Sequence, residues 1–423
     1  MFFPFTHFPF LTSSFPSVFM KLWKKILLVL LALLLVSQVP FAYRRYRLGQ
    51  LHGAIERLNA ERVVTRNESG YADYRGVVHV HSNLGGHSTG TLEDIVRAAQ
   101  VNGLNFVVMT EHPSEILDTA GMTLNGMHGG VLFVGGNEIS TSDGSRLLLV
   151  PGGEAAGKAG SQTTQAFINQ AKAAGELAFV AYPQEFRSWS ANGYDGIEVY
   201  NLYTNAKRIN YFTLFFDGLW SYRSYPELLF ARFYERPAES LRRWDELNSS
   251  GNVRLVATAG NDAHANVGIR FGDETGRRFL GIKLDPYERS FRIVRTHVLL
   301  HEGQQLSAET LLFALKNGHS YFSFDLFCDA GGFSFTASST TEQKIMGDEI
   351  QLGDGVRLDV SAPVASRIVL IRDGSPVQTE NSATHREFAV NQKGVYRVEV
   401  YLNQLQPFVV DNPWIISNPI YVR

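Results

Sequence analysis

The sequence predicts an α/β protein whose main domain is a β/α barrel. From Tyr74 onward, short apolar runs alternate with segments of helical periodicity, which is the order of a parallel sheet covered by helices. Several apolar runs end in histidine, aspartate or glutamate. Such residues at the carboxyl ends of strands are typical of β/α barrels, whose sites lie at that face. A doubly wound open sheet with the same element order is the alternative.

The 423 residues suit one large domain, expected over residues 74–330, and a smaller one over residues 331–423. The strands expected in the large domain are Gly76–His81, Phe106–Met109, Val131–Val134, Leu147–Val150, Leu177–Ala181, Gly196–Tyr200, Val253–Ala257 and Thr296–Leu300. The helices expected there are one starting at Thr91 with a capping box to Asp94, Thr164–Ala174, Leu241–Leu247 and Ala308–Leu315. The aromatic-rich segment Arg208–Arg236 is an insertion. Packing is its simplest role, and a wall of the site or a membrane contact are the alternatives.

After Gly331, short runs of alternating polarity replace the helical patterns. They are Ser334–Ala337, Val356–Val360, Arg367–Arg372 and Val395–Tyr401, with turn signals at Asp373-Gly374 and Lys393-Gly394. This pattern predicts a small β-sandwich. It contains no catalytic constellation, and His385 is expected at its surface.

The N-terminal segment, residues 1–47, contains the apolar run Ile26–Tyr43 between basic residues on both sides. Its length is close to the minimum for a membrane-spanning helix. A cleaved signal peptide ending at Ala42 is the alternative, but Pro40 fits a cleavage motif poorly. We therefore expect an uncleaved anchor, a linker helix over residues 48–73, and an extracytoplasmic catalytic domain. Because both flanks are basic, the positive-inside rule leaves the orientation open.

Composition excludes several classes of function. The formal net charge is −2, and no basic block lies beyond the N-terminus, so no nucleic-acid surface is expected. Cys328 is the single cysteine, so the chain has neither an internal disulfide nor a thiolate zinc site. The sequence lacks a Gly-X-Ser-X-Gly elbow and a Walker motif.

The residues that carry chemistry are histidines and acids close to the ends of expected strands. They are His79, His81, His87, His112, Glu138, Asp262 and His264. Side chains at positions i and i+2 of a strand share a face, so His79 and His81 aim at one point. Imidazole together with carboxylate suits zinc, iron or manganese. A bridging carboxylate such as Glu138 can hold two cations, which together activate water against an ester.

These residues resemble the polymerase and histidinol phosphatase (PHP) family, in the family's order and over roughly Tyr74 to Phe324. The matching motifs are His79-Val80-His81 with His87, Thr110-Glu111-His112, Gly136-Asn137-Glu138-Ile139-Ser140, Gly196-Ile197-Glu198-Val199-Tyr200-Asn201 and Gly260-Asn261-Asp262-Ala263-His264. The resemblance implies a distorted seven-stranded β/α barrel. The run from Pro413 to Val422 is similar to the tail of exported members with a β-rich C-terminal domain, some of them like carbaryl hydrolase.

The resemblance also implies the ligand sets. One metal would be held by His79, His81, Glu138 and Asp262, and another by His87, His112 and His264, with Glu138 bridging towards a further position. The catalytic residues that we expect are Glu138, Asp262, Glu111 and Arg187. We expect two divalent cations (Zn, Mn or Fe), with a third as the alternative.

Two positions depart from the family pattern. Tyr182-Pro183 stands where a His-Pro is usual, and a tyrosine ligates metal only if the metal lowers its pKa strongly. Glu111 stands where aspartate is common, and its expected role is to orient a ligand, with a solvent-facing salt bridge as the alternative. No histidine near Asn201 completes a third site.

The expected activity is hydrolysis of a small phosphoester by metal-activated water. Candidates for substrate binding follow the barrel strands, with a surface salt bridge as the alternative for each: Arg187, Asn201, Asn266 and Arg270. A carboxyl or carbamate ester substrate is the second hypothesis. The third is a degenerate, non-enzymatic protein that binds a partner in the cell envelope.

Overall fold

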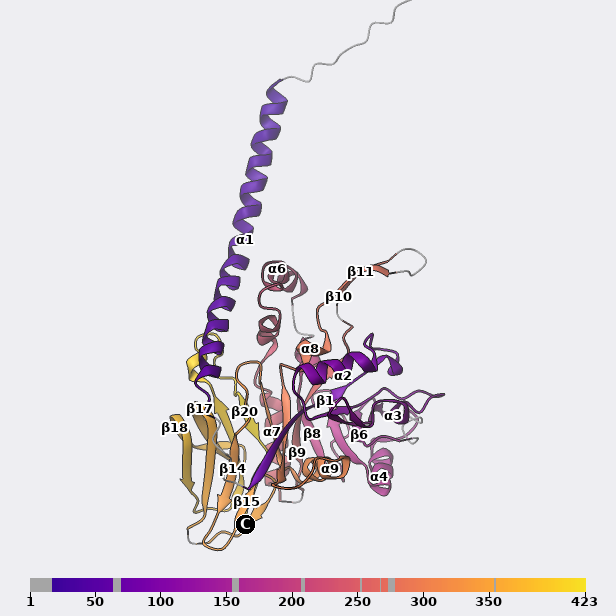
Figure 1. Ribbon diagram of the computed structural model, residues 1–423, viewed down its shortest axis with the longest axis vertical. Helices are drawn as coiled ribbons and strands as arrows, with labels where there is room; N and C mark the ends of the chain where they lie inside the picture. Colours follow the sequence, from indigo (N-terminus) through magenta and orange to yellow (C-terminus); the bar gives the residue numbers. More distant parts are fainter. Residues whose placement is uncertain are drawn as a thin grey trace, which may run out of the picture.

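The long N-terminal helix dominates the outline of the molecule (Figure 1). The computed structural model describes residues 17–63, 70–153, 160–206, 210–251, 253–266, 268–272, 278–353 and 355–423. Helix α1 (Ser17–Ala60) rises from the body, and residues 21–37 are exposed along their whole length. This stretch is long and apolar enough to cross a membrane, with a mean hydropathy of 2.4 in its most apolar window.

The other half of α1 is part of the folded body. Leu51, Ile55 and Leu58 are buried in a core cluster that also contains residues of the main sheet. No helix boundary falls at residue 47, and Tyr71–Asp73, assigned to the linker by the sequence, begin the first strand. One continuous helix therefore joins the apolar segment rigidly to the body.

The remaining helices are short. In the described part of the chain they are α2 (Leu92–Val101), α3 (Thr119–Met122), α4 (Thr164–Ala174), α5 (Leu202–Ala206), α6 (Tyr211–Ser221), α7 (Ala238–Ser249), α8 (Tyr287–Ser290) and α9 (Ala308–Asn317), with 3₁₀ helices at Asn83–Gly85, Glu227–Phe233 and Asn403–Leu405. The predicted capping box of α2 is confirmed, because Thr91 and Asp94 bond each other's backbone amides.

The main sheet carries the site. Its strands are β1 (Tyr71–Val80), β2 (Phe106–Met109), β3 (Gly126–His128), β4 (Val131–Val134), β5 (Asn137–Ser140), β6 (Arg146–Val150), β7 (Leu177–Ala181), β8 (Gly196–Asn201), β9 (Val256–Ala263), β12 (Arg295–His301) and β13 (Ser320–Ser323). Six of them pair in parallel in the order β4–β2–β1–β9–β8–β7. A separate hairpin, β10 (Gly268–Gly272) with β11 (Arg278–Lys283), projects from the body.

The sheet is mixed, so the expectation of a purely parallel sheet is wrong. Strand β6 runs antiparallel to β7, and β5 antiparallel to β6. The cause is local, because the tight turn between Ser140 and Arg146 joins β5 and β6 as a hairpin, and such a short connection forces antiparallel pairing. A parallel bridge between Glu111 and Asn137 brings β5 back beside the end of β2. The α/β class and the apolar N-terminal helix are confirmed, whereas the seven-stranded barrel stays a prediction.

The C-terminal region is a set of strands joined to the main sheet. They are β14 (Ser334–Ser338), β15 (Gln343–Ile345), β16 (Glu349–Ile350), β17 (Arg357–Arg372), β18 (Ser375–Ala389), β19 (Gly394–Tyr401), β20 (Ile415–Ser417) and β21 (Ile420–Val422). Strand β20 pairs with both β13 and β19, so hydrogen bonds run from one region into the other. Arg397 of β19 binds Asp245 of α7 through two hydrogen bonds of 2.7 and 2.8 Å. The division into a barrel and a separate β-sandwich stays a prediction.

Candidate metal centre

The centre lies where three strands of the main sheet end. His79 comes one residue before the end of β1, Asp262 one residue before the end of β9, and Tyr182 directly after β7. All three have left-handed backbones, with φ of 68°, 48° and 47°. The pairing of β1 shifts register between Val78 and Val80 on both sides, so His79 sits in a bulge. Bulges and left-handed residues re-aim side chains at functional sites, and here they turn these three towards one another.

Four buried side chains form the first group of ligand atoms. His79, His81, Glu138 and Asp262 each offer one atom, and these atoms lie within 4.8 Å of one another. His79 Nε2 lies 3.2 Å from Glu138 Oε2 and 3.5 Å from Asp262 Oδ1. His81 Nε2 lies 3.3 and 3.4 Å from the same two oxygens. Two imidazoles and two carboxylate oxygens therefore face a common point.

Each carboxylate of this group has one oxygen held by the protein and one directed at the histidines. Arg146 donates from Nη1 to Glu138 Oε1 at 2.8 Å. The Tyr182 hydroxyl donates to Asp262 Oδ2 at 2.6 Å. Because the outer oxygens are occupied, Oε2 of Glu138 and Oδ1 of Asp262 are left to face the centre. Tyr182 thus orients an acid in this structure, and its role as a metal ligand stays a prediction.

Glu198 lies behind His79 and fixes its tautomer. Glu198 Oε1 is 2.6 Å from His79 Nδ1, which assigns a proton to Nδ1 and directs Nε2 at the other ligand atoms. Asn201 donates to the other Glu198 oxygen at 3.0 Å. The space for this carboxylate exists because residue 260 is glycine, since a Cβ on Gly260 would lie 1.7 Å from Glu198 Oε1. Glu198 and Gly260 occur in the sequence motifs, but no role was predicted for either.

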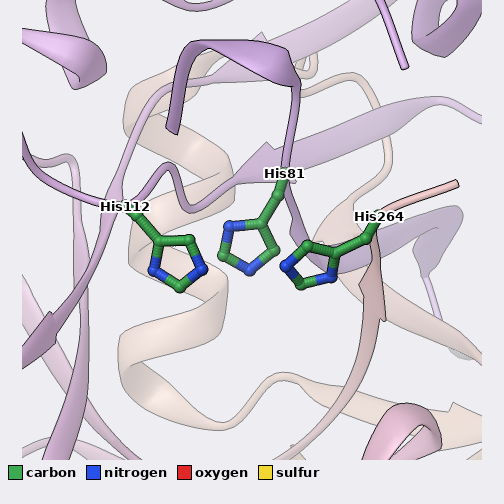
Figure 2. A group of neighbouring side chains, drawn as sticks. All are labelled: His81, His112 and His264. Atoms are coloured by element: carbon green, nitrogen blue, oxygen red, sulfur yellow. The ribbon is translucent and has the colours of Figure 1, made fainter. Parts of the chain in front are cut away.

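Three imidazoles form a second group that shares His81 with the first. The three rings come from three separate segments and lie side by side, with His81 between His112 and His264 (Figure 2). The ring centroids of His81 and His112 are 4.5 Å apart, and those of His81 and His264 are 4.2 Å apart. His264 Nδ1 is 2.9 Å from the backbone oxygen of Asp262, which favours Nε2 of His264 as the ligand atom.

The charges of these groups suit cation binding. Burial opposes ionisation of Glu138 and Asp262, but the neighbouring histidines outweigh it and hold both carboxyl pKa values below their usual range. Burial and the nearby His81 lower the pKa of His112 to about 3 and that of His264 to about 4. Ionised carboxylates and neutral imidazoles are the forms that ligate metal.

In His79 and His81 the pKa is raised instead of lowered. Burial would lower the pKa of His79, but Glu198, Asp262 and Glu138 outweigh it and raise that pKa well above its usual value. Asp262 and Glu138 likewise raise the pKa of His81 against its burial. Positive charge on these two rings therefore balances the carboxylates, at the place where a cation would do the same.

Unpartnered atoms at the centre support the fit of a metal ion. Among the described residues, three buried atoms of the centre form no hydrogen bond. They are Nδ1 and Nε2 of His81 and Oδ1 of Asp262. Buried polar atoms without partners are costly. A cation at the common point would satisfy them, and the mixture of imidazole and carboxylate suits zinc, iron or manganese.

Other predicted residues lie at the edge of the centre or outside it. His87 is exposed, and its ring centroid is 4.9 Å from that of His112, but it belongs to neither group of ligand atoms. Glu111 is buried and accepts hydrogen bonds from the Ser82 amide at 3.0 and 3.1 Å, so it holds the turn after His81. Arg187 is exposed, and its guanidinium donates to the Asp143 carbonyl at 3.4 Å, away from the ligand atoms.

The other candidate substrate residues have different surroundings. Asn201 donates to Glu198 and approaches Asp262 Oδ2 at 3.4 Å, whereas Asn266 donates to the His87 carbonyl at 2.9 Å. The backbone of Arg270 belongs to β10, but its side chain lies outside the described residues. Arg146 was missed because nothing in the order of motifs links it to Glu138. The signal was its place at the start of β6, eight residues after Glu138 in a hairpin.

The comparisons with known proteins give only distant likeness. No protein-family model matches the chain, and no curated protein matches it. Among solved structures, PsfC from Pseudomonas syringae PB-5123 has 15% identity and a TM-score of 0.34, covering 59% of this chain and 92% of that one. Endonuclease Q, in complex with a 27-mer duplex substrate with an abasic lesion at its active site, has 13% identity and a TM-score of 0.35. The lesion-specific endonuclease PfuEndoQ from Pyrococcus furiosus has 14% identity and a TM-score of 0.35.

This chain covers 60% and 64% of those two endonuclease chains, and they cover 66% and 65% of this one. At these identities and TM-scores, the likeness decides neither the fold nor the activity. The metal centre therefore stands on its own geometry.

Proposed function

We propose that this chain is a membrane-anchored, metal-dependent hydrolase of the PHP type, with a phosphoester as its substrate. Its mixed sheet would be the distorted seven-stranded barrel of that family, and its centre would hold two divalent cations. The observation that carries the proposal is the overlap of two groups of ligand atoms at His81, whose buried ring nitrogens form no hydrogen bond. Zinc, manganese and iron are the candidate metals.

The residues of the centre have distinct tasks in this proposal. Glu138 and Asp262 supply the negative charge that attracts cations, and Arg146 and Tyr182 hold these carboxylates in place. Glu198 fixes the tautomer of His79. When bound at such a site, divalent cations supply Lewis-acid chemistry that makes water nucleophilic near neutral pH.

Arg146 favours an anionic substrate. Its side chain is 42% exposed, although its guanidinium reaches the buried Glu138. A guanidinium has five N–H donors, so donors remain for phosphoryl oxygens at the rim of the centre. A carboxyl or carbamate ester remains the second candidate, since the same centre would act on either carbonyl or phosphoryl groups.

A substrate panel separates these candidates. Full-length protein, purified in detergent and loaded with manganese or zinc, would be given p-nitrophenyl phosphate, bis-p-nitrophenyl phosphate and p-nitrophenyl acetate. Faster turnover of a phosphate ester, lost in Asp262→Asn, supports the proposal, and preference for the acetate favours the second candidate. A DNA duplex with an abasic lesion, the substrate bound by one structural neighbour, tests whether this centre also acts on nucleic acid.

Metal content is measured on the same preparations. Two bound equivalents per chain support the proposal, and three would show that a further position is filled. Failure to hydrolyse any ester when loaded with metal would favour the third hypothesis, a binding protein of the cell envelope.

We also propose that the apolar half of α1 anchors the protein with its body outside the cytoplasm. The helix is long and apolar enough to span a bilayer, and residues 21–37 of it are exposed. Protease added to intact cells and to inverted membrane vesicles distinguishes the two orientations. Digestion of the body from the cytoplasmic face would contradict this placement.

A further inference from the structure

Helix α6 buries polar residues and exposes apolar ones, which is the opposite of an ordinary surface helix. Its most buried residues include Asp217 and Ser221, which are 2% and 1% exposed. Its most exposed residues are apolar, with Phe212 at 68%, Leu219 at 67% and Phe215 at 50%. These three apolar positions are spaced i, i+3 and i+7, which places them on one face of the helix. A contiguous apolar face that points away from the body indicates a contact with something apolar outside the chain.

The polar side of α6 contacts α1 through an ion pair and a hydrogen bond. Arg44 donates to Asp217 Oδ1 at 2.7 Å, and Asp217 is almost fully buried. Trp220 Nε1 donates to Gln38 Oε1 at 3.0 Å, and the Phe41 and Phe216 rings lie 4.9 Å apart. Figure 1 shows α6 nearly end-on beside the upright α1, so its axis runs across that of α1.

The contact with α1 lies at the end of the apolar segment. At about 1.5 Å per residue, the helix rises roughly 28 Å between Lys25 and Arg44. That rise is close to the roughly 30 Å thickness of a hydrocarbon core. Tyr43 and Tyr46 are 57% and 61% exposed at this end, as expected for the aromatic belt at a membrane surface. If α1 spans a bilayer, α6 therefore lies at the boundary between headgroups and acyl chains.

We propose that α6 is an interfacial helix that lies along a phospholipid bilayer with Phe212, Phe215 and Leu219 in the lipid. This inference rests on the anchoring role proposed for α1. Continuity with the apolar half of α1 identifies lipid as the occupant of the apolar face, because both surfaces meet at Gln38, Phe41 and Arg44. Amphipathic helices of this kind bury their apolar face in the boundary region of the bilayer.

The interfacial helix would set the position of the metal centre relative to the membrane. Tyr203 of α5, which precedes α6 in the chain, has its ring centroid 5.8 Å from that of His264. The β10–β11 hairpin, which follows His264, projects on the same side of the body as the apolar half of α1 (Figure 1). Membrane contact at α6 would therefore hold the side of the body that carries this centre towards the headgroup layer.

Site-directed spin labelling of the full-length protein in phosphatidylcholine–phosphatidylglycerol nanodiscs tests the proposal. Single cysteines are introduced as Phe215→Cys, Leu219→Cys, Leu31→Cys and Phe313→Cys, and each label is probed with oxygen and a water-soluble nickel chelate. Phe313 is the matched control, since it is an apolar residue 59% exposed on α9, and Figure 1 shows α9 on the side of the body away from the apolar half of α1. The native Cys328 is buried, so the unmodified chain provides the blank.

The expected result is that labels at positions 215 and 219 resemble the label at position 31. Their ratio of oxygen to nickel accessibility should be several-fold higher than at position 313. A ratio equal to that at position 313, with position 31 inside the bilayer, overturns the interfacial helix and leaves the anchor intact. Spin–spin broadening at position 219 would show that a second copy covers the face, and also overturns it.

A water-exposed label at position 31 would overturn both the anchor and the interfacial helix. The hydrolase proposal is measured separately, by metal-dependent turnover of the soluble esters in detergent. Retained metal content in each labelled variant shows that the variant is folded.

Discussion

The metal centre and helix α6 break the usual distribution of side chains in opposite ways. At the centre, the exposed fraction is 2% or less for His79, His81 and Glu138, and the two ring nitrogens of His81 form no hydrogen bond with the described residues. On α6, Phe212 and Leu219 are more than 60% exposed while Asp217 is buried. Buried polar atoms without hydrogen bonds and exposed apolar side chains are both unfavourable for the isolated chain in water. The comparison teaches that the two proposals rest on one argument, in which each region would be completed by something from outside the chain, cations at the centre and lipid at α6.

The largest effect is expected from removing the histidine that the two ligand groups share. In His81→Ala, both groups lose an imidazole, and kcat/KM should fall by about a thousandfold or more because the chemistry depends on the metals. Metal content and turnover are measured together, with His385→Ala, an exposed histidine of β18, as the control. Full activity in His81→Ala would remove this centre from the reaction.

A smaller loss is expected from the acid behind His79. Glu198→Gln keeps the shape but weakens the hold on His79 Nδ1, and loss of such an outer partner lowers metal affinity by about 10- to 100-fold. Gly260→Ala should act in the same direction, because its Cβ would collide with Glu198, whereas Gly353→Ala meets nothing within 4 Å and serves as the control. Competition with a chelator measures the affinities. Unchanged affinity in Glu198→Gln would show that the carboxylate is only structural.

Metal affinity should weaken as the pH falls. The pKa values of His79 and His81 are raised by the surrounding carboxylates despite burial, so a cation must displace protons from these rings. As the pH falls from about 8 to about 6, the higher proton concentration makes this displacement less favourable, and the apparent dissociation constant should rise steadily. Isothermal titration in buffers of different ionisation heat counts the protons released. Binding without proton release would contradict the assignment of these two ligands.

Breaking the ion pair between α6 and α1 should lower the free energy of unfolding by about 1–3 kcal/mol, because the Arg44 guanidinium loses the buried carboxylate that it contacts. The variant is Asp217→Asn, which removes the ion pair with Arg44. Its control is Glu387→Gln, which breaks the exposed pair with Arg357 and should cost less than about 1 kcal/mol. Thermal unfolding in detergent compares the two. Equal stability of both variants would show that Arg44 and Asp217 do not fix α6.

The smallest expected effect is on the pH dependence of stability, and it comes from His297, a buried histidine that contacts Asp73 and Asp325. Burial opposes charge on His297, but Asp73 and Asp325 outweigh it and raise its pKa to about 9. Since this folded value lies above the ordinary value near 6.5, the stabilisation is complete below about 6.5 and is lost as pH rises through about 9. His297→Gln should flatten this part of the stability profile, while His385→Gln should leave it unchanged. A slope that persists in His297→Gln belongs to another group.

Local sequence patterns predicted many of the strands and helices and suggested candidate ligands by residue type. The paired histidines at 79 and 81, and the acids near other strand ends, could be found because strand periodicity and residue type are local properties. The hairpin of β5 and β6 was not anticipated. Its turn is a local signal, but the short apolar runs on either side suit parallel and antiparallel strands alike.

By itself, the sequence determined the α/β class, the apolar N-terminal segment and the types of ligand available. Only the tertiary structure decided which oxygen of each carboxylate faces the centre, that Glu198 stands behind His79, and that Gly260 leaves room for it. It also decided that α6 turns its aromatic face outward, through the contact of Asp217 with an arginine 173 positions away. The physical reason is that hydrogen bonds and steric fit depend on distances between elements, which residue order alone does not fix.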